Sequence, residues 1–592
     1  MYQQIYDPVA QSIGATAAFA AIPLAVLFVM LGVFKVPARW AACSALISSI
    51  VVAITVYGMP VSQTGSAALE GASVGFFPII WIGINAIWIF KLTQASGHDA
   101  VLRSCLSTVS PDLRVQAVLI AFCFGGLLES LAGGGAPVAI CAVMLIAIGV
   151  NPLKAAAICL LADTSPVAFG SLGLPISVLS KITQLPVHSL GVMVGRQTPL
   201  LALFVPLILV VVADGKRGLR EVWPLAFVAG ITFATSQCLG SMVLPIELVD
   251  IASALTSSIS VITFLKIWSP RVSRSRIDDE TVVPAANAMP GLMWAMPAPV
   301  GISVGASALT REGPVSEIAS GDESQASGGR PTTYGAAGDA GAIAGSPRIA
   351  EVIRALAPYG AIILLVALMQ VKPIGHLFGA ATSTFDWPGL NVSTSSGARV
   401  AVKAKFEWLS SAGSIVLLAG LLVVPVLGLS WRRAFSVYLT TLHELRWAVF
   451  TVCCVVGVAY VMNLSGQVVT LGIFAANAGP MFAFVSPVLG WIATALTGSD
   501  TSANALFGVL QTTTAHHTGL SSVLLAAANS SGGVVGKAIS PQNLTIAAVA
   551  VGMTGKEGLL FRRVFGWTLL MIAVMSLLVF LQSTTVLGWM VP

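Results

Sequence analysis

Two carboxylates stand in surroundings that are unusual for charged side chains. Glu129 lies in GLLESLAGGGAPVAI (126–140), between apolar stretches long enough to cross a bilayer, and Asp163 lies in ADTSP (162–166). An ionised carboxylate is costly in a low-dielectric site, so an acid held there can alternate between a charged and a neutral form. Both residues are therefore predicted to carry protons. The alternative for Glu129 is a structural carboxylate that pairs with a lysine or caps a backbone break, and the alternative for Asp163 is a helix cap.

Hydroxyl and amide side chains gather around the same positions and in two later stretches. TGSDTSANA (497–505) places Asp500 among such groups, and ANSSG (528–532) resembles ADTSP. These side chains are predicted to line a polar site, although any single one could instead satisfy broken backbone. Histidine and cysteine show no metal-binding spacing, so neither a metal nor a cofactor is expected.

The elements that position these groups are membrane helices. Of the 592 residues, 56% are hydrophobic and only 9% are charged, and apolar stretches of about 20 residues recur along the chain. This pattern predicts an all-α polytopic protein with about 12–14 transmembrane helices. Clear spans are expected near 12–34, 38–58, 72–92, 190–213, 222–240, 246–268, 352–371, 409–430, 447–464 and 566–590. The net charge of +6 does not suggest nucleic acid as a partner, and the lipid bilayer is the expected surrounding.

A polar segment divides the chain into two halves. Residues 269–350 are rich in Ala, Gly and Ser, cannot bury a core and are predicted to form a disordered cytoplasmic insert. The N-terminal transmembrane half is 1–268 and the C-terminal half is 351–592. Placing the basic loops between spans in the cytoplasm lets nearly every crossing alternate, with both termini outside.

The two halves contain similar Gly-rich regions. ADTSPVAFGSLGLP from Ala162 aligns with ANSSGGVVGKAISP from Ala528, and the charges place the starts of the two regions on opposite membrane faces. This predicts two inverted repeats with broken or re-entrant helices, an arrangement common among secondary transporters. Irregular backbone at membrane depth persists only inside protein or beside water, so a polar site is expected there. The predicted helix breaks are at Gly133, Gly134, Gly135, Pro137, Gly532 and Gly533.

Five long motifs resemble the L-lactate permease family, which includes glycolate permeases. They are FGGLLESLAGGGAPVAI (124–140), NPLKAAAICLLADTSPVAFGSLGLPI (151–176), GRQTPLL (195–201), LTGSDTSANALFGVLQ (496–511) and AAANSSGGVVGKAISPQN (526–543). The resemblance covers most of the chain apart from the insert. It implies a multi-pass protein of the cell membrane that imports L-lactate and related 2-hydroxy monocarboxylates, such as D-lactate and glycolate, with a proton. Three features depart from the family pattern. The family usually has Gly in place of Ser130 and Asn in place of Asp163, and its glycine run is usually interrupted, whereas Gly133 to Gly135 are consecutive here.

Given such a substrate, the polar side chains are assigned to bind it. The predicted substrate-binding set is Arg196, Thr164, Ser165, Ser499, Asp500, Thr501, Ser502, Asn504, Asn529, Ser530 and Ser531. Arg196 is the favoured anion partner because a guanidinium binds a carboxylate through two hydrogen bonds, with a structural partner for Glu129 or Asp163 as the alternative. Lys537 is expected to snorkel or to pair with an acid, and His516 and His517 to be solvated.

Other functions remain as alternatives. Oxygen-rich helix breaks can also coordinate sodium, so a sodium-coupled carrier or a carrier of another organic anion is the runner-up. A membrane-embedded enzyme is disfavoured because no GxSxG, HExxH, CxxC or P-loop motif stands at a convincing position. A channel is likewise disfavoured.

Overall fold

The described part of the chain is almost entirely helical. The computed structural model describes residues 2–34, 36–98, 101, 109–131, 133, 135–270, 349–369, 371–395, 397, 403–553 and 556–592. The compact unit considered below comprises Met1–Val282 and Arg348–Pro592. The predicted insert at 269–350 lies outside the described residues except at its two ends. The all-α class is confirmed.

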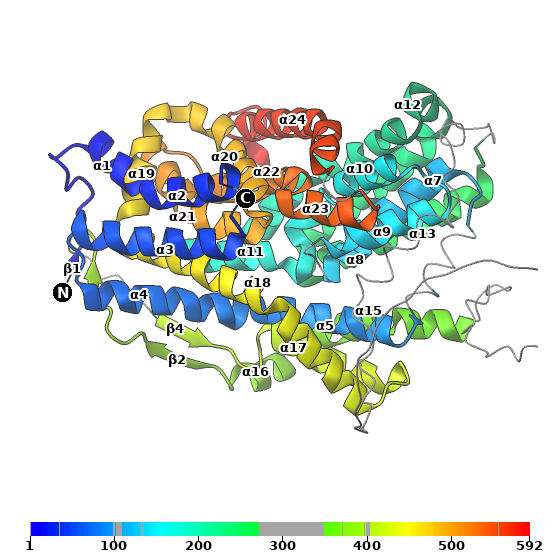
Figure 1. Cartoon of the computed structure of the whole chain (residues 1–592), viewed down its shortest axis with the longest axis horizontal. Helices are drawn as coiled ribbons and strands as arrows, with labels where there is room; N and C mark the ends of the chain where they lie inside the picture. The colour runs from blue at the N-terminus through cyan, green and yellow to red at the C-terminus, as the bar shows by residue number, and fades with distance from the viewer. Residues whose placement is uncertain are drawn as a thin grey trace, which may run out of the picture. The chain divides into compact units, whose positions relative to one another are not determined.

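The helices of the N-terminal half, coloured from blue to green in Figure 1, lead into the first Gly-rich region and out of it. They are α1 (Ile13–Ala20), α2 (Ile22–Gly32), α3 (Ala38–Thr55), α4 (Val61–Val74), the π-helical η1 (Gly75–Ile80), α5 (Trp81–Ala95), α7 (Leu113–Ala117), the π-helical η2 (Val118–Phe124), α8 (Gly125–Leu131), α9 (Ala136–Ala147), α10 (Pro152–Ala162), η3 (Val167–Phe169), α11 (Gly170–Thr183), α12 (Val187–Val243) and α13 (Ile246–Ile267).

The C-terminal half adds the remaining helices and four short strands. The helices are α15 (Ile349–Met369), α16 (Lys372–Gly379), α17 (Ala412–Val426), α18 (Trp431–Ser465), α19 (Gln467–Ala475), η6 (Ala476–Met481), α20 (Phe482–Thr497), α21 (Asp500–Thr518), α22 (Ser522–Gly536), η7 (Lys537–Ile539), α23 (Pro541–Ala550), α24 (Glu557–Gln582) and η8 (Gly588–Met590). Strand β1 (Tyr2–Gln3) pairs in parallel with β3 (Val392–Ser393), and β2 (Ser383–Asp386) pairs antiparallel with β4 (Lys403–Phe406).

Many of these helices are suited to a bilayer. Among the described residues, nine are long and apolar enough to cross a membrane, and the pair formed by α10 and η3–α11, bent by 62°, makes a tenth candidate. The longest, α12, folds back on itself at Asp214 and Gly215, whose backbone is not helical. Its arms run antiparallel, since Gly230 lies against the carbonyl of Leu203 and Gly195 against Ser241. These arms match the separate spans predicted at 190–213 and 222–240, while the total of about 12–14 crossings stays a prediction.

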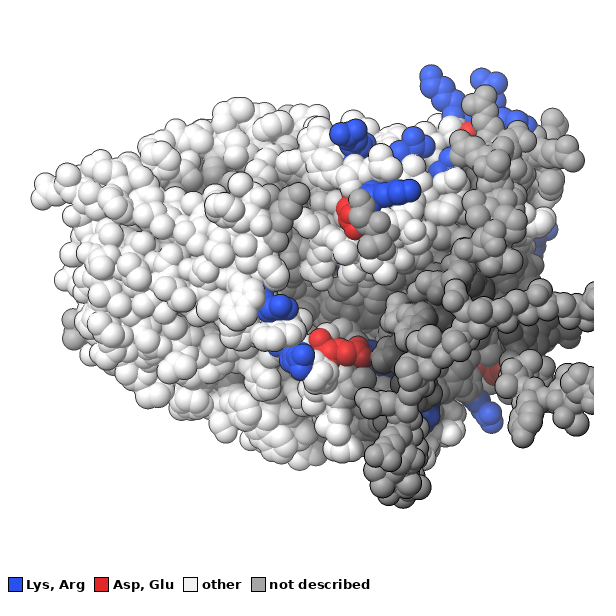
Figure 2. Space-filling model, viewed as in Figure 1, with Lys and Arg blue, Asp and Glu red and all other residues white. Residues whose placement is uncertain are grey.

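Charge is unevenly distributed over the surface. Figure 2 shows Lys and Arg side chains gathered toward one end of the visible face, the end at which α7 and one end of α12 lie in Figure 1, with a broad uncharged surface beyond them. Large apolar side chains such as Phe204, Trp223 and Leu570 are exposed on the helices. This is the surface of a protein whose solvent along the helices is lipid. The basic end fits the predicted cytoplasmic side, and orientation in the cell stays a prediction.

The two Gly-rich regions have the same order of elements. In the first, α8, a break, α9, α10, a second break and η3–α11 follow one another. In the second, α20, a break, α21, α22–η7, a second break and α23 follow in the same order. The first break in each region contains glycine in the left-handed conformation, Gly133 (φ 56°) and Gly135 (φ 85°) in one and Gly498 (φ 76°) in the other. Pro137 stands at the start of α9, and Gly134 lies outside the described residues.

The predicted breaks at Gly532 and Gly533 were wrong. Both glycines lie inside α22, which runs without interruption to Gly536, and the chain breaks at Lys537–Ser540 instead. A β-carbon on Gly532 would overlap the carbonyl of Pro487 in α20, and one on Gly533 would overlap the Asp500 carboxylate. These glycines therefore permit close packing of α20, α21 and α22 rather than a change of chain direction.

Candidate functional site

A lysine from the second region bridges two carboxylates from the first. Lys537 Nζ lies 2.5 Å from Glu129 Oε1 and 3.0 Å from Asp163 Oδ2, and the three side chains are at most 5% exposed. Each residue is placed by a helix break. Glu129 comes from the last turn of α8, Asp163 caps the C-terminus of α10, and Lys537 follows α22. The site thus depends on all three interruptions.

The backbone leaves room for the Glu129 side chain. A β-carbon on Gly170 would lie 3.0 Å from Glu129 Oε1, and one on Gly133 would lie 3.7 Å from the same atom. Gly170 opens α11 and Gly133 belongs to the break after α8. Two helix breaks therefore form the wall around one carboxylate, which is the arrangement predicted from GLLESLAGGGAPVAI. Glu129 also pairs with a lysine, Lys537, which was the alternative interpretation of this residue. Its ion pair and its predicted role in proton transfer therefore belong to one site.

Charges in this triad do not balance when every group is ionised. Two carboxylates face one ammonium, which leaves a net charge of −1 in a buried place. Glu129 Oε2 and Asp163 Oδ1 have no hydrogen-bond partner among the described residues. A buried charge without a partner costs several kcal/mol, so the arrangement favours uptake of one positive charge. A proton on one of the two acids would meet that requirement.

A second polar cluster surrounds Asp500. Ser530 Oγ donates to Asp500 Oδ2 at 2.6 Å, and the Asn504 amide donates to Ser530 Oγ at 3.1 Å and to the carbonyl of Pro175 at 3.2 Å. Asn529 in turn donates to Asn504 Oδ1 at 2.9 Å. Four predicted substrate-binding residues therefore lie together in one buried network, between α21, α22 and the start of α11.

One face of α22 joins the two clusters. Ser530, Gly533 and Lys537 follow one another at helical spacing, so they lie on one side of the helix. Ser530 binds Asp500, the bare backbone of Gly533 lies against Asp500 and Thr494, and Lys537 binds Glu129 and Asp163. Among the described residues, Asp500 Oδ1 and Thr494 Oγ1 are buried without a hydrogen-bond partner. Unsatisfied oxygens thus mark both ends of this face, which is expected of a site that binds a polar ligand.

Sequence reasoning missed the glutamines of α12. Ser531 Oγ donates to Gln197 Oε1 at 2.7 Å, and Thr198 Oγ1 donates to Gln237 Oε1 at 3.1 Å. Gln237 Nε2 reaches the carbonyl of Ser165 at 3.4 Å. The motif GRQTPLL contained two of these residues, but the sequence does not say which of its side chains points inward.

Arg196, the predicted anion partner, is not brought to this network. Its guanidinium donates to the carbonyl of Met590 at 2.6 Å, near the C-terminal end of the chain. The neighbouring Gln197 occupies the inward position on the helix instead. His516 and His517 are exposed at the end of α21, as expected of a solvated pair.

Of the other predicted residues, Thr164 and Ser499 hydrogen-bond to local backbone. Thr164 Oγ1 donates to the carbonyl of Leu161 at 2.7 Å, and Ser499 caps α21 by accepting from the backbone of Ser502 at 3.3 Å. Thr501 stands in the first turn of α21, where it is partly buried. Ser165 is fully buried and its hydroxyl has no hydrogen-bond partner among the described residues. In the part of the chain that the structure describes, no group of three or more His, Cys, Asp or Glu residues is placed to hold a metal ion.

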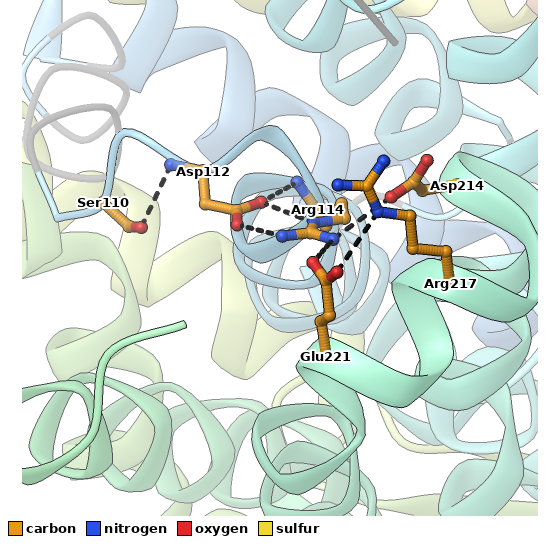
Figure 3. A network of polar contacts seen from close by, with 6 residues as sticks. All are labelled: Ser110, Asp112, Arg114, Asp214, Arg217 and Glu221. Carbon is orange, nitrogen blue, oxygen red and sulfur yellow. Dashed lines mark hydrogen bonds and ion pairs between the residues drawn. The ribbon is translucent and has the colours of Figure 1, made fainter. Parts of the chain in front are cut away.

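A separate ionic network stabilises the fold-back of α12 (Figure 3). Arg114 is fully buried and forms ion pairs with Asp112 at 2.8 Å, Asp214 at 3.1 Å and Glu221 at 2.7 Å. Arg217 pairs with Glu221 at 3.2 Å. Because Asp214 stands where the two arms of α12 meet, this network fixes α7 to the turn between them. The guanidinium is saturated with carboxylates, so we assign it a structural role.

Interrupted apolar helices around buried, incompletely paired polar groups define a membrane transporter rather than an enzyme. The model of the L-lactate permease family matches residues 16–297 and 330–586. The chain is 37% identical over 606 residues to the glycolate permease GlcA of Escherichia coli K12, covering 100% of this chain and 99% of that protein. It is 36% identical over 623 residues to the L-lactate permease of Bacillus subtilis 168, covering 100% of both. The chain belongs to the L-lactate permease family, and it is a multi-pass protein of the cell membrane.

A solved structure of MtrF from Neisseria gonorrhoeae aligns with 97% of this chain and 96% of its own, at 12% identity and a TM-score of 0.45. The YdaH transporter of Alcanivorax borkumensis aligns over 86% of both chains at a TM-score of 0.41 and 13% identity. Neither likeness is close enough to bear on the site.

Proposed function

We propose that this protein imports L-lactate and related 2-hydroxy monocarboxylates, including D-lactate and glycolate, by proton symport. Relatives over the full length are L-lactate permeases and a glycolate permease, which supports substrates of this size and charge. The observation that carries the coupling is the bridge from Lys537 to Glu129 and Asp163, at 2.5 Å and 3.0 Å.

The bridge suggests how one proton and one anion bind together. With both acids ionised, they occupy the Lys537 ammonium and repel a further carboxylate. Protonation of Glu129 or Asp163 weakens one of these pairings and leaves the ammonium with a single ionised partner. Lys537 then has a hydrogen-bond position for the substrate carboxylate, and the total buried charge stays at −1, the value that it has before proton and anion bind. Anion binding thereby requires the proton.

The second cluster supplies groups that suit the 2-hydroxyl of the substrate. Asp500 accepts hydrogen bonds, Asn504 both donates and accepts, and Ser530 links them on the same face of α22 as Lys537. A substrate held between Lys537 and this cluster would present its carboxylate to the lysine and its hydroxyl to the acid. A monocarboxylate without the hydroxyl would leave Asp500 Oδ1 unsatisfied and should bind more weakly.

Coupling to a proton also removes an electrical penalty. Import of a lone anion against the membrane potential costs about 2.3 kcal/mol per charge per 100 mV, whereas an anion with one proton carries no net charge. The pH gradient can then drive accumulation. A co-transported sodium ion would remove the same electrical penalty, so the experiment must separate the two cations.

Lys537→Met tests the role of the ammonium, because methionine preserves an unbranched side chain without charge. Purified protein in vesicles should lose exchange of labelled L-lactate by at least tenfold. Lys91→Met is the matched control, since Lys91 pairs with the exposed Glu444 outside the site, and it should exchange like the parent. Normal exchange by Lys537→Met would contradict the proposal. Replacement of sodium by choline should leave uptake by the parent unchanged, and loss of uptake would favour the sodium-coupled alternative.

A further inference from the structure

We infer that α13 provides a proton uptake route to the site, with Glu247 receiving the proton in a cavity and Asp250 passing it inward. This inference rests on the proposed proton coupling and adds two residues that sequence reasoning did not single out. Both carboxylates come from the first two turns of one helix, three positions apart, so they lie on neighbouring parts of one face.

The cavity has a volume of about 170 Å³ and lies between α11, α13, α15 and α17. Its walls are mostly apolar side chains of α15 and α17, with Leu172 from α11 and Ser410 from the segment before α17. Among the described residues that line this cavity, Glu247 is the one with a charged side chain. A carboxylate in such a wall repels a free anion and attracts a cation or a proton, so this cavity suits water and protons better than the substrate.

The cavity borders the wall of the Glu129 site. Leu172 has φ 59° and the preceding Ser171 has φ 46°, a left-handed conformation that is unfavourable for both residues. Ser171 Oγ stands directly over Gly133, which lies beside Glu129. The strained segment thus has Leu172 in the cavity lining and Ser171 over the glycine beside the Glu129 carboxylate. We place the outer end of the route at Glu247 because the predicted topology puts the start of α13 outside.

Asp250 is the inward neighbour of Glu247. It is 1% exposed, its Oδ1 accepts from Gln237 Nε2 at 2.9 Å, and its Oδ2 has no hydrogen-bond partner among the described residues. No salt bridge compensates its charge in the part of the chain described. A buried carboxylate in this state is stabilised by a proton, so it can accept one and release it again.

The charged and titratable groups on the elements packed against α13 leave Asp250 without a cation. α8 contributes Glu129, η2 contributes Cys123 and α11 contributes Lys181. The groups on α15 and α12 are Glu351, Arg354, Tyr359, His188, Arg196, Cys238 and the charges around the fold-back, Asp214, Lys216, Arg217, Arg220 and Glu221. Lys181 pairs with Glu407 at 3.8 Å and Arg196 binds the carbonyl of Met590. Asp250 therefore lies near neutral groups and the acid Glu247, and not within an ion pair.

From Asp250 the polar groups continue to the triad. Gln237 Nε2 bridges Asp250 Oδ1 and the carbonyl of Ser165. The Ser165 hydroxyl, which none of the described residues hydrogen-bonds, stands in the same break. Asp163, two residues before Ser165, contacts Lys537 and thereby Glu129. The proton moves from water to Glu247, then to Asp250, and then through the hydroxyl or a water to the triad, where either Glu129 or Asp163 holds it. Each step breaks one O–H bond and forms another, and no other reactant is required.

Glu247→Gln and Asp250→Asn test the route in vesicles that contain a trapped pH-sensitive dye. Both variants should slow net lactate uptake and the accompanying acidification by at least tenfold, because the proton has lost its carrier. Exchange of labelled for unlabelled lactate should stay within about twofold of the parent, since exchange requires no net proton movement. Glu407→Gln is the control. Glu407 is close in sequence to Ser410 but is not among the residues that line the cavity, so this variant should behave like the parent.

The outcomes separate the route from the proposed function. If uptake by the parent is accompanied by acidification and both variants acidify the vesicles at the parental rate, the proposed route is overturned. Proton symport itself would stand. Lactate uptake by the parent without acidification would refute proton symport itself. Loss of exchange in Asp250→Asn would show that Asp250 acts in substrate binding and would overturn its assignment here. Ser410→Trp tests the cavity independently, because the larger side chain should fill it and slow net lactate uptake. Undiminished net uptake by this variant would contradict a route through the cavity.

Discussion

Glu129→Gln should separate exchange from accumulation. Glutamine keeps the size and one hydrogen-bonding oxygen of glutamate but has no proton to release, so it mimics the protonated carboxyl group. Lys537 then retains only Asp163 as an ionised partner, at 3.0 Å in the parent. This is the charge state in which we propose that the substrate binds. The variant should bind lactate and exchange it, yet fail to couple its movement to protons.

The size of the effect follows from the coupling. For one proton per anion, a pH difference of one unit is worth about 1.4 kcal/mol, which is a tenfold concentration ratio. The parent should therefore accumulate L-lactate about tenfold in vesicles that are one pH unit more alkaline inside, and Glu129→Gln should reach a ratio near one. Exchange at saturating lactate should stay within about threefold of the parent.

Glu70→Gln is the matched control. Glu70 is also a buried glutamate, 3% exposed, and its Oε2 has no hydrogen-bond partner in the described part of the chain. It lies on α4, beside Gly71 at the contact with α18. Its replacement should leave accumulation near tenfold. Accumulation of tenfold by Glu129→Gln as well would refute Glu129 as the proton carrier, and Asp163 or Asp500 would become the next candidate.

The other predictions concern the rest of the site and its packing. Asp163→Asn, which introduces the residue that the family resemblance implies at this position, should reduce accumulation less than Glu129→Gln, measured in the same vesicles. Gly532→Ala forces a β-carbon into the backbone of Pro487, so the free energy of unfolding should fall by about 1–3 kcal/mol, seen as a lower melting temperature of the purified protein. Arg196→Met should leave the KM for lactate within about threefold of the parental value, because the Arg196 guanidinium binds the carbonyl of Met590 and not the site. A tenfold rise in KM would support Arg196 as the partner of the substrate anion.

The sequence predicted the general architecture because its signals are local. Apolar length predicted the helices, and the turn between 213 and 222 was visible because Asp214, Gly215 and Lys216 interrupt two apolar stretches. Glycine runs predicted the break around Gly133 and Gly135, where the backbone adopts the left-handed conformation. Glu129 stood out for the same reason, since a charge inside an apolar stretch is rare without a purpose.

Long-range pairings could not be read in the same way. Lys537 and Glu129 are 408 residues apart, and no local pattern says which acid the lysine reaches. Glycine is ambiguous too, because Gly532 and Gly533 permit close packing of helices whereas Gly133 permits a turn, and composition does not distinguish the two. Asp250 was a missed signal, since a carboxylate in the apolar stretch 246–268 met the same criterion as Glu129.

The most direct test of the account measures proton and lactate movement together. Vesicles containing the parent protein and a trapped pH-sensitive dye receive labelled L-lactate outside, with no sodium present and the membrane potential clamped first at zero and then at 100 mV, negative inside. The account predicts one proton entering per lactate and the same extent of accumulation at both potentials, because the complex of anion and proton is neutral. Lactate entry without proton entry, or a dependence of accumulation on membrane potential, would contradict it.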